Sequence, residues 1–312
     1  MLTSSGGVAH LERRGCSSRV VKIVWFSSLM PWLRTNFATL VIFSLLAMGA
    51  ASDTATAAAP SNFQAKHHSV FWLPKLSDTF ELQLTGALAI KVSTNIYDID
   101  LFDNSSIQIT QLKQQKRKIV CYFSAGSGED WRPDFAKFSK TDLGKPLQGW
   151  PGENWLDIRS KNVRKIMLDR ILFAKHKGCD GIDPDNVDGY TNSTGFPIST
   201  SNQLDYNRFL SRQAHAHGLA IGLKNDIAQI ASLVSDFDFA VNEQCYEFAE
   251  CDAYQEFILR NKPVLNVEYQ ERYVSNTDRA FDELCAKSRI KRFHTLVLPY
   301  LLDASFRKSC DN

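Results

Sequence analysis

The stretch that decides the fold is Gly178-Cys179-Asp180-Gly181-Ile182-Asp183-Pro184-Asp185-Asn186-Val187-Asp188, in which a short apolar strand runs into a cluster of acids. A second stretch, Val241-Asn242-Glu243-Gln244, repeats this arrangement farther along the chain. Residues that follow parallel strands gather on one face of the sheet, where the backbone holds them rigidly. We therefore expect Asp185 and Glu243 to lie on the same face.

Short apolar runs alternate with longer amphipathic ones on both sides of this stretch, which is the pattern of parallel strands and crossover helices. Eight strands are expected, at residues 80–84, 89–96, 118–123, 181–183, 220–223, 237–241, 264–267 and 293–298. Helices are expected at residues 162–177, 204–217, 227–234 and 277–289. Eight strands in a segment of this length favour a parallel eight-stranded (β/α)8 TIM barrel over a doubly wound open sheet. We expect one domain over residues 62–312.

The first 51 residues differ from the rest of the chain. Basic residues precede an apolar block from Phe37 to Ala51, and an Ala/Thr-rich linker follows at residues 52–61. The block is shorter than the roughly 20 residues of a membrane-spanning helix, which favours a cleaved signal peptide. The long basic leader leaves an uncleaved signal anchor open as the alternative. Both alternatives export residues 62–312, either as a secreted protein or to the cell surface, and only the anchor would involve a membrane.

Charge and cysteine content bound the class of protein further. The formal net charge of +2 comes from the leader, because the remainder is slightly acidic, and it gives no reason to expect a nucleic-acid partner. Beyond the leader the cysteines form an even set, which suits an oxidising compartment. The alternative is that some are free buried thiols. The sequons at Asn104 and Asn192 agree with an exported glycoprotein. The expected disulfides are Cys245–Cys251, Cys285–Cys310 and Cys121–Cys179.

Polar side chains follow the expected strands, and acids among them outnumber bases. A concave face crowded with carboxylates attracts a cationic or hydroxyl-rich ligand rather than a phosphate. Trp131 and Tyr246 fall in the same loops, where their flat faces suit sugar rings. Hydrolysis of a glycosidic bond needs one acid to protonate the departing oxygen and one carboxylate to meet the electron-poor sugar carbon. The alternative for each of these residues is ordinary loop polarity or packing.

Several uncommon motifs occur in order over residues 71–270. They are Tyr97-Asp98-Ile99-Asp100-Leu101-Phe102, Cys121-Tyr122-Phe123-Ser124-Ala125-Gly126, Glu129-Asp130-Trp131-Arg132-Pro133-Asp134, Gly149-Trp150-Pro151-Gly152-Glu153-Asn154-Trp155-Leu156-Asp157, Asp183-Pro184-Asp185-Asn186-Val187-Asp188, Gly222-Leu223-Lys224-Asn225-Asp226 and Asn242-Glu243-Gln244-Cys245. In these motifs the chain resembles glycoside hydrolase family 114, the endo-α-1,4-polygalactosaminidases. The resemblance implies a (β/α)8 barrel that cleaves α-1,4-linked galactosamine chains with retention at the anomeric carbon. It also implies that Asp185 is the nucleophile and Glu243 the general acid and base. Many members of the family have Glu where Asp183 stands.

The residues themselves favour Asp185 over Asp183 as the nucleophile, because Pro184 ends the strand and leaves Asp185 at the lip of the barrel. Lys224, after the next strand, would favour the charged form of Asp185, the alternative being an ordinary ion pair. Retention requires carboxyl groups about 5 to 5.5 Å apart, and inversion about 6.5 to 9.5 Å. Glu268 is the rival of Glu243 for acid and base duty, and Asp98 with Asp100 are candidates for binding the sugar amine. The expected substrate-binding residues are Asp98, Asp100, Glu129, Trp131, Asp183, Asn186, Asp188, Lys224, Tyr246, Glu268 and Tyr269.

We expect neither a metal nor a cofactor. The acids between Asp98 and Asp103 lack the glycine and terminal Glu of a calcium-binding hand. His215-Ala216-His217 stands at a helix end, where structural use is favoured over metal binding. Two other functions stay open: a barrel that binds polysaccharide without cutting it, and a metal-dependent deacetylase or amidohydrolase of amino sugars. The expected partner is a cationic or partly acetylated galactosamine-containing polysaccharide.

Overall fold

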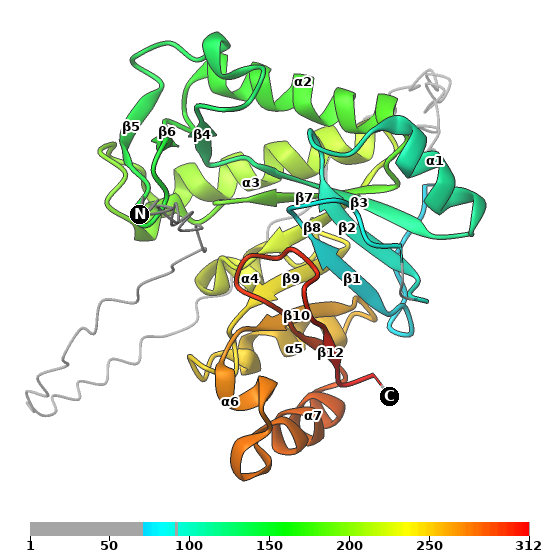
Figure 1. Cartoon of the computed structure of the whole chain (residues 1–312). Coiled ribbons are helices and arrows are strands. Elements are labelled where there is room, and N and C mark those ends of the chain that lie inside the picture. The colour runs from blue at the N-terminus through cyan, green and yellow to red at the C-terminus, as the bar shows by residue number, and fades with distance from the viewer. Residues whose placement is uncertain (1–70, 91–92, 312) are drawn as a thin grey trace, which may run out of the picture. The chain divides into compact units, whose positions relative to one another are not determined.

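The fold is built on one curled sheet, seen in a computed structural model that describes residues 71–90 and 93–311 (Figure 1). The predicted leader and linker lie outside the described residues. The sheet has nine strands in the order β1-β2-β3-β7-β8-β9-β10-β11-β12. Eight of them are parallel neighbours, and β12 pairs antiparallel with β11. The strands are β1 (Phe80–Gln83), β2 (Ile96–Asp100), β3 (Lys118–Ser124), β7 (Gly181–Asp185), β8 (Ala220–Lys224), β9 (Phe239–Glu243), β10 (Val264–Glu268), β11 (His294–Val297) and β12 (Lys308–Ser309).

All eight predicted strands overlap a parallel strand of the sheet, but the second shares only Ile96 with β2, which lies later in the chain than predicted. The apolar run at residues 89–96 begins as a loop, because the side chain of Gln83 bonds to the backbone of Ala87 and Ala89. The strand itself starts at Ile96 and carries the acids Asp98 and Asp100. Apolar periodicity does not detect a strand of this composition.

The edges of the sheet meet through the chain that connects β11 to β12. Among the described residues no ladder pairs β1 with β11 or β12. Instead the backbone N–H groups of Leu84 and Thr85 donate to the carbonyl of Leu302, at 3.0 and 3.2 Å. The guanidinium of Arg307 donates to the carbonyl of Phe80 at 3.0 Å and forms an ion pair with Glu81 at 2.6 Å. The finding is therefore a curled parallel sheet in place of the closed ladder of eight strands.

Helices cover the outer face of the sheet (Figure 1). α1 packs on β3, α2 on α3, α3 on β8 and α7 on β11. Ser160 caps α2, and Gly178 ends it in the left-handed region at φ 94°, which turns the chain into β7. The α-helices are α1 (Ser106–Gln114), α2 (Lys161–Lys177), α3 (Thr200–Ala216), α4 (Ile230–Leu233), α5 (Gln255–Ile258), α6 (Glu271–Val274) and α7 (Ala280–Lys291). The 3₁₀ helices are η1 (Phe135–Lys137), η2 (Gly189–Thr191), η3 (Ile227–Gln229), η4 (Cys251–Tyr254) and η5 (Thr277–Arg279).

A second, three-stranded antiparallel sheet lies between β3 and α2 in the sequence. It consists of β4 (Ser127–Glu129), β6 (Glu153–Leu156) and β5 (Leu143–Pro146), in that spatial order. The prediction did not include it. Its strands are short and contain glycine, proline and charged residues, so that no apolar alternation marks them.

The two largest hydrophobic cores result from the alternation of side chains along the strands. The core inside the curl contains Phe80, Leu82, Val120, Val241 and Val267, among others. The larger core lies between the sheet and the helices. All three predicted disulfides are present, and each ties a strand or loop to a neighbouring element: Cys121–Cys179, Cys245–Cys251 and Cys285–Cys310. Over residues 71–90 and 93–311, no helix combines the length and apolar character needed to cross a membrane.

Candidate active site

The last residues of β7, β8 and β9 converge inside the curl of the sheet. Asp185 ends β7, Lys224 ends β8 and Glu243 ends β9. Val241 belongs to the inner core, and period-two alternation therefore turns Glu243 inward as well. All three side chains are more than nine-tenths buried. Neighbouring parallel strands thus bring together three charged groups that lie far apart in the sequence.

Lys224 contacts both carboxyl groups. Its Nζ lies 3.4 Å from Oδ1 of Asp185 and 3.5 Å from Oε2 of Glu243. Because both oxygens lie this close to one nitrogen, they are at most about 7 Å apart, a limit that admits the retaining spacing and also the lower end of the inverting one. The two acids singled out from the sequence therefore face one shared space.

Two tyrosines fix the orientation of the carboxyl groups. The hydroxyl of Tyr122, on β3, donates to Oδ2 of Asp185 at 2.9 Å. The hydroxyl of Tyr269, just after β10, donates to Oε1 of Glu243. In contrast, Oε2 of Glu243 is buried and accepts no hydrogen bond from the described part of the chain. This oxygen is the one that contacts Lys224, whereas Tyr269 holds the other.

The backbone bends sharply after each of the three strands. Asn186, Asn225 and Gln244 follow β7, β8 and β9, and all three adopt positive φ, at 60°, 49° and 66°. The backbone N–H of Asn186 bonds to Oδ1 of Asp185 at 2.7 Å, and Oδ1 of Asn225 accepts from the N–H of Glu243 at 3.1 Å. Asparagine tolerates this conformation better than most residues, which explains its use at two of the three bends.

A pair of aspartates lies one layer beneath the converging strand ends. Asp98 on β2 and Asp183 on β7 are both 0% exposed. Burial raises the pKa of Asp183 to about 7, with the charge of Lys224 opposing the rise and that of Asp185 contributing to it. Burial, followed by the charge of Asp183, raises the pKa of Asp98 well above its ordinary value. Both predicted substrate-binding residues therefore form the floor of the site.

Asp100 and Glu129 belong to a buried ion-pair network centred on Arg132. Its guanidinium donates to both oxygens of Asp100, at 3.1 and 2.5 Å, and to Oε2 of Glu129 at 2.9 Å. Burial raises the pKa of Glu129, and the Arg132 charge opposes that rise. Because the two carboxyl groups are already paired, they shape the wall of the site, and Asp100 is not positioned as an open receptor for an amine.

A pocket of about 470 Å³ lies one residue contact away from Asp185. Tyr122 connects the two, since it lines the pocket and also bonds to Asp185. Asp103 and Asp130 add carboxyl groups to its wall. Its aromatic lining consists of Tyr122, Trp131, Trp150 and Tyr300, and this aromatic pocket is large enough for a sugar ring.

Asn186 and Asp188 lie in the loop that follows β7. The side-chain amide of Asn186 donates to Ser124 and Ser127, at 2.9 and 3.1 Å, and contacts Glu153 at 3.4 Å. Burial raises the pKa of Glu153 to about 8. Burial also raises the pKa of Asp188 to about 6, helped by the charge of Asp185. Asn186 thus anchors the loop to the second sheet.

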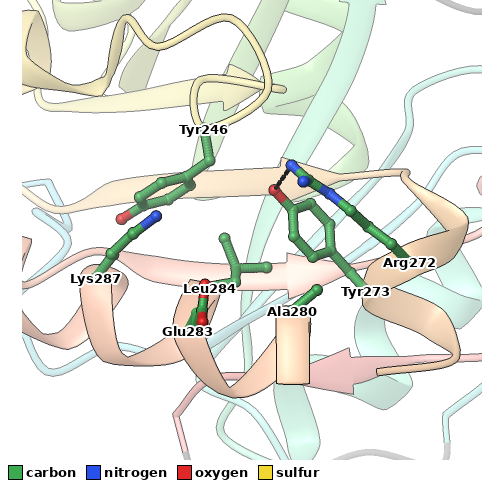
Figure 2. A pocket seen from close by; sticks show the side chains of 7 residues that line it. All are labelled: Tyr246, Arg272, Tyr273, Ala280, Glu283, Leu284 and Lys287. Carbon is green, nitrogen blue, oxygen red and sulfur yellow. Dashed lines mark hydrogen bonds between the residues drawn. The ribbon is translucent and has the colours of Figure 1, made fainter. Parts of the chain in front are cut away.

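Glu268 and Tyr246 lie on the outer face of the sheet. Val267 belongs to the inner core, so alternation turns Glu268 outward, where it accepts from the backbone N–H of Tyr246 at 2.9 Å. Burial raises the pKa of Glu268 to about 7. Tyr246 lines a small pocket of about 90 Å³ together with α6 and α7 residues such as Arg272 and Tyr273 (Figure 2). Glu268 and Glu243 therefore face opposite sides of the sheet.

His215, which was considered as a metal ligand, instead contacts neighbouring side chains of the protein. His215 bonds through Nε2 to Asp238 at 2.9 Å, and its ring stacks on Phe71. Oδ1 of Asp100 accepts backbone bonds from Phe102 and Asp103, which closes a turn. Within the described ranges, no three His, Cys, Asp or Glu side chains form a group that could hold a metal ion.

Tyr122 and Glu153 are functional candidates that the prediction left out. Tyr122 lies within the apolar run Cys121-Tyr122-Phe123, where composition alone marks it as core. Its position two residues after the inward-facing Val120 is the signal that could have identified it. Glu153 stands in a strand that was not predicted.

Comparisons with known proteins identify the family of the chain. The profile of glycoside-hydrolase family GH114 matches residues 60–312. The crystal structure of Aspergillus fumigatus Ega3 in complex with galactosamine is similar at 41% identity and a TM-score of 0.72, covering 78% of this chain and 100% of that one. The glycoside hydrolase domain of PelA from Pseudomonas aeruginosa shares the fold at 13% identity and a TM-score of 0.58, covering 73% of this chain and 96% of that one. No curated protein matches the chain. With the family profile and the Ega3 similarity both spanning most of its length, the chain belongs to glycoside-hydrolase family GH114 and is a glycosidase.

Proposed function

We propose that this protein is an endo-acting glycosidase that cleaves α-1,4-linked galactosamine polysaccharide with retention at the anomeric carbon. The observation that carries the proposal is the placement of Asp185 and Glu243 on either side of Lys224, at 3.4 and 3.5 Å. The upper limit of about 7 Å on the distance between their oxygens includes the spacing of a retaining pair.

Asp185 is the nucleophile in this mechanism. Its carboxylate attacks the anomeric carbon and forms a covalent glycosyl-enzyme intermediate as the glycosidic bond breaks. Tyr122 and Lys224 each contact one of its oxygens, which fixes the carboxylate for attack. Tyr122 and Lys224 both present hydrogen-bond donors, which stabilise Asp185 as a carboxylate.

Glu243 is the general acid and then the general base. Its Oε2, which accepts no hydrogen bond from the described residues, delivers a proton to the departing oxygen. The same atom later removes a proton from the water that hydrolyses the intermediate. Tyr269 holds the other oxygen throughout and keeps the carboxyl group aligned.

The substrate is a chain of galactosamine whose amines are at least partly free. The aromatic pocket offers flat faces for sugar rings, and Asp103 and Asp130 offer negative charge for ammonium groups. The similar protein Ega3 was crystallised with galactosamine. Trp131 is 46% exposed on this wall, where it can stack on a sugar. We further propose that the chain is exported, which three disulfides support.

The test compares D185N and E243Q with E268Q, a matched change of a buried carboxyl on the outer face. We expect the first two variants to lose hydrolysis of galactosamine polysaccharide by about 1,000-fold or more, whereas E268Q keeps its rate. Nuclear magnetic resonance of the first product would show the α-anomer, and short oligosaccharides would show internal cleavage. Binding without products would instead indicate a non-catalytic barrel, and release of acetate a deacetylase.

A further inference from the structure

The second sheet presents two polar side chains to the loop that follows β7. β4 pairs antiparallel with β6, with Ser127 opposite Trp155 and Glu129 opposite Glu153. Because side chains alternate between the two faces of a strand, Ser127 and Glu153 lie on the same face of this sheet. The hydroxyl of Ser127 donates to Oε1 of Glu153. Both side chains are buried, so the two residues form one polar contact that is shielded from water.

Asn186 connects this polar contact to the proposed nucleophile. Its side-chain amide donates to Ser127 at 3.1 Å and contacts Oε1 of Glu153 at 3.4 Å. Its backbone N–H donates to Oδ1 of Asp185 at 2.7 Å. Ser124, at the end of β3, completes the network, because its hydroxyl accepts from the same side-chain amide at 2.9 Å and bonds to the hydroxyl of Ser127. A continuous series of hydrogen bonds thus links Glu153 to the carboxyl group of Asp185.

The orientation of Asn186 decides where Asp185 points. The backbone carbonyl of Asp185 is held by the N–H groups of Ala125 and Gly126, at 2.8 and 3.0 Å. Its side chain can still rotate, and the N–H of Asn186 is one of the groups that hold it. Asn186 itself has a φ of 60°, a conformation that is unfavourable for an L-amino acid. The hydrogen bonds of its side chain stabilise that conformation, so losing them would move the N–H that contacts Asp185.

Glu153 serves this network as a hydrogen-bond acceptor. Its Oε1 faces two donors, the hydroxyl of Ser127 and the amide of Asn186. Burial, followed by the charge of Glu129, raises the pKa of Glu153 to about 8. Below that pH the neutral acid accepts hydrogen bonds without placing a second negative charge near Asp185. A glutamine at this position would offer the same acceptor.

We propose that Glu153 is a positioning residue, which acts through Ser127 and Asn186 to fix the carboxylate of Asp185. The proposal rests on the proposed function of Asp185 as the nucleophile. Glu153 takes no part in the bond-breaking steps and acts only on the orientation of the group that attacks.

E153A and E153Q separate the acceptor from the rest of the side chain. E153A removes Oε1, and we expect kcat to fall by about 10-fold or more with KM within about 2-fold, because a misaligned carboxylate slows attack without weakening sugar binding. E153Q keeps the acceptor, so its kcat should exceed that of E153A by about 5-fold or more. Equal kcat in the two variants, or wild-type kcat in E153A, would overturn the proposal.

D142A is the matched control for E153A. Asp142 precedes β5 of the same sheet and is also a buried carboxyl that accepts from two serines and an asparagine. Ser139, Ser160 and Asn162 donate to it at 2.7, 2.6 and 2.7 Å. We expect D142A to lower the melting temperature as E153A does but to keep its kcat. A loss of kcat in D142A equal to that in E153A would show a general loosening of the sheet and would refute a specific role for Glu153.

S127A and the amide signal of Asn186 keep the test decisive if E153A folds poorly. S127A removes the hydroxyl between Glu153 and Ser124, and we expect kcat to fall by about 3-fold or more. In nuclear magnetic resonance spectra of the substrate-free protein, the backbone amide proton of Asn186 should move upfield in S127A, because its bond to Asp185 lengthens, and stay in place in D142A. An unmoved signal in S127A would overturn the proposal. If D185N and E243Q kept full activity, the proposed function would fail, whereas the Asn186 signal would still test the link to Asp185.

Discussion

Lys224 is a single residue on which the geometry of the site depends. K224M keeps most of the length of the side chain but removes its charge, so Asp185 and Glu243 lose their common cation. We expect kcat to fall by about 100-fold, the size of effect seen when one preorganised charge is lost. We also expect a loss of about 3 to 5 kcal/mol of unfolding free energy, because buried acids are left unpaired. Polysaccharide hydrolysis and urea unfolding measure the two effects.

K113M is the matched control for this change. Lys113 pairs with Asp180 at 3.4 Å, but its side chain is 40% exposed. An exposed pair contributes about 1 kcal/mol at most, and no effect on kcat is expected. A K224M enzyme with wild-type kcat would contradict the assigned role of Lys224.

The tyrosine hydroxyls can be tested separately from the rings that carry them. Y122F removes one hydrogen bond to Asp185, and Y269F removes one to Glu243. Each variant should lose about 10-fold in kcat with little change in KM, because the bond orients a reacting group and does not bind sugar. Y273F is the control, since Tyr273 bonds to Arg272 on the outer face (Figure 2). Equal losses in all three variants would argue against a specific role.

Sequence patterns predicted the two acids that we propose as reacting groups, but not the tyrosines that contact them. Asp185 and Glu243 were predictable because acids directly after apolar strands gather on one face. Tyr122 was not, because a tyrosine between cysteine and phenylalanine has the composition of a core. Glu268 follows an apolar strand in the same way as Glu243, yet it faces outward, because the register of each strand decides which side its last residue takes.

At the scale of elements, the turn after β3 packs tightly against the turn after β7. A Cβ added to Gly126 would lie 1.7 Å from the carbonyl oxygen of Asn186. We expect G126A to displace the loop after β7 and to lower kcat by about 10-fold or more, since a shift of about 1 Å in a reacting group is costly. Assays of kcat and of the melting temperature would measure this.

G149A is the control for G126A, because Gly149 has open space around it. No atom lies within 4 Å of its added Cβ, although its φ of 88° makes alanine strained. G149A should therefore cost about 1 kcal/mol in stability and leave kcat unchanged. Loss of activity in G149A and not in G126A would contradict the conclusion that close packing at Gly126 positions the loop after β7.

Elements with regular apolar spacing were predicted well, and irregular ones were not. The helix at residues 161–177 agrees with its prediction to within one residue, because Ser160 and Gly178 mark both ends. β2 was misplaced, because buried acids interrupt its apolar pattern. The second sheet was missed, because its short strands bury only a few apolar residues, such as Leu143 and Leu156, without a regular alternation.

Across the whole molecule, buried acids make stability depend on pH. Burial raises the pKa of Asp183 and Glu268 to about 7, and that of Glu153 and Asp226 to about 8. The folded protein therefore keeps protons that the unfolded chain releases above about pH 4.5. The resulting stabilisation is complete at lower pH and is lost as the pH rises through about 7 to 8. We expect the melting temperature to be higher at about pH 5 than at about pH 8.5.

E268Q provides the control for this dependence. Glutamine resembles the protonated acid but cannot ionise, so the melting temperature of E268Q should fall less over the same pH range. A melting temperature that rises with pH in the wild-type protein would show that these acids are not held protonated by the fold.

The contacts made by Leu302 and Arg307 cover backbone groups at the β1 edge of the sheet. A protein that stopped before Leu302 would lose the bonds to Leu84, Thr85 and Phe80 along with β12 and the Cys285–Cys310 disulfide. Both edge strands of the sheet would then expose unpaired backbone N–H and C=O groups that can pair with another chain. We expect such a shortened protein to self-associate, as light scattering would reveal, because residues 302–310 no longer cover the two edges of the sheet.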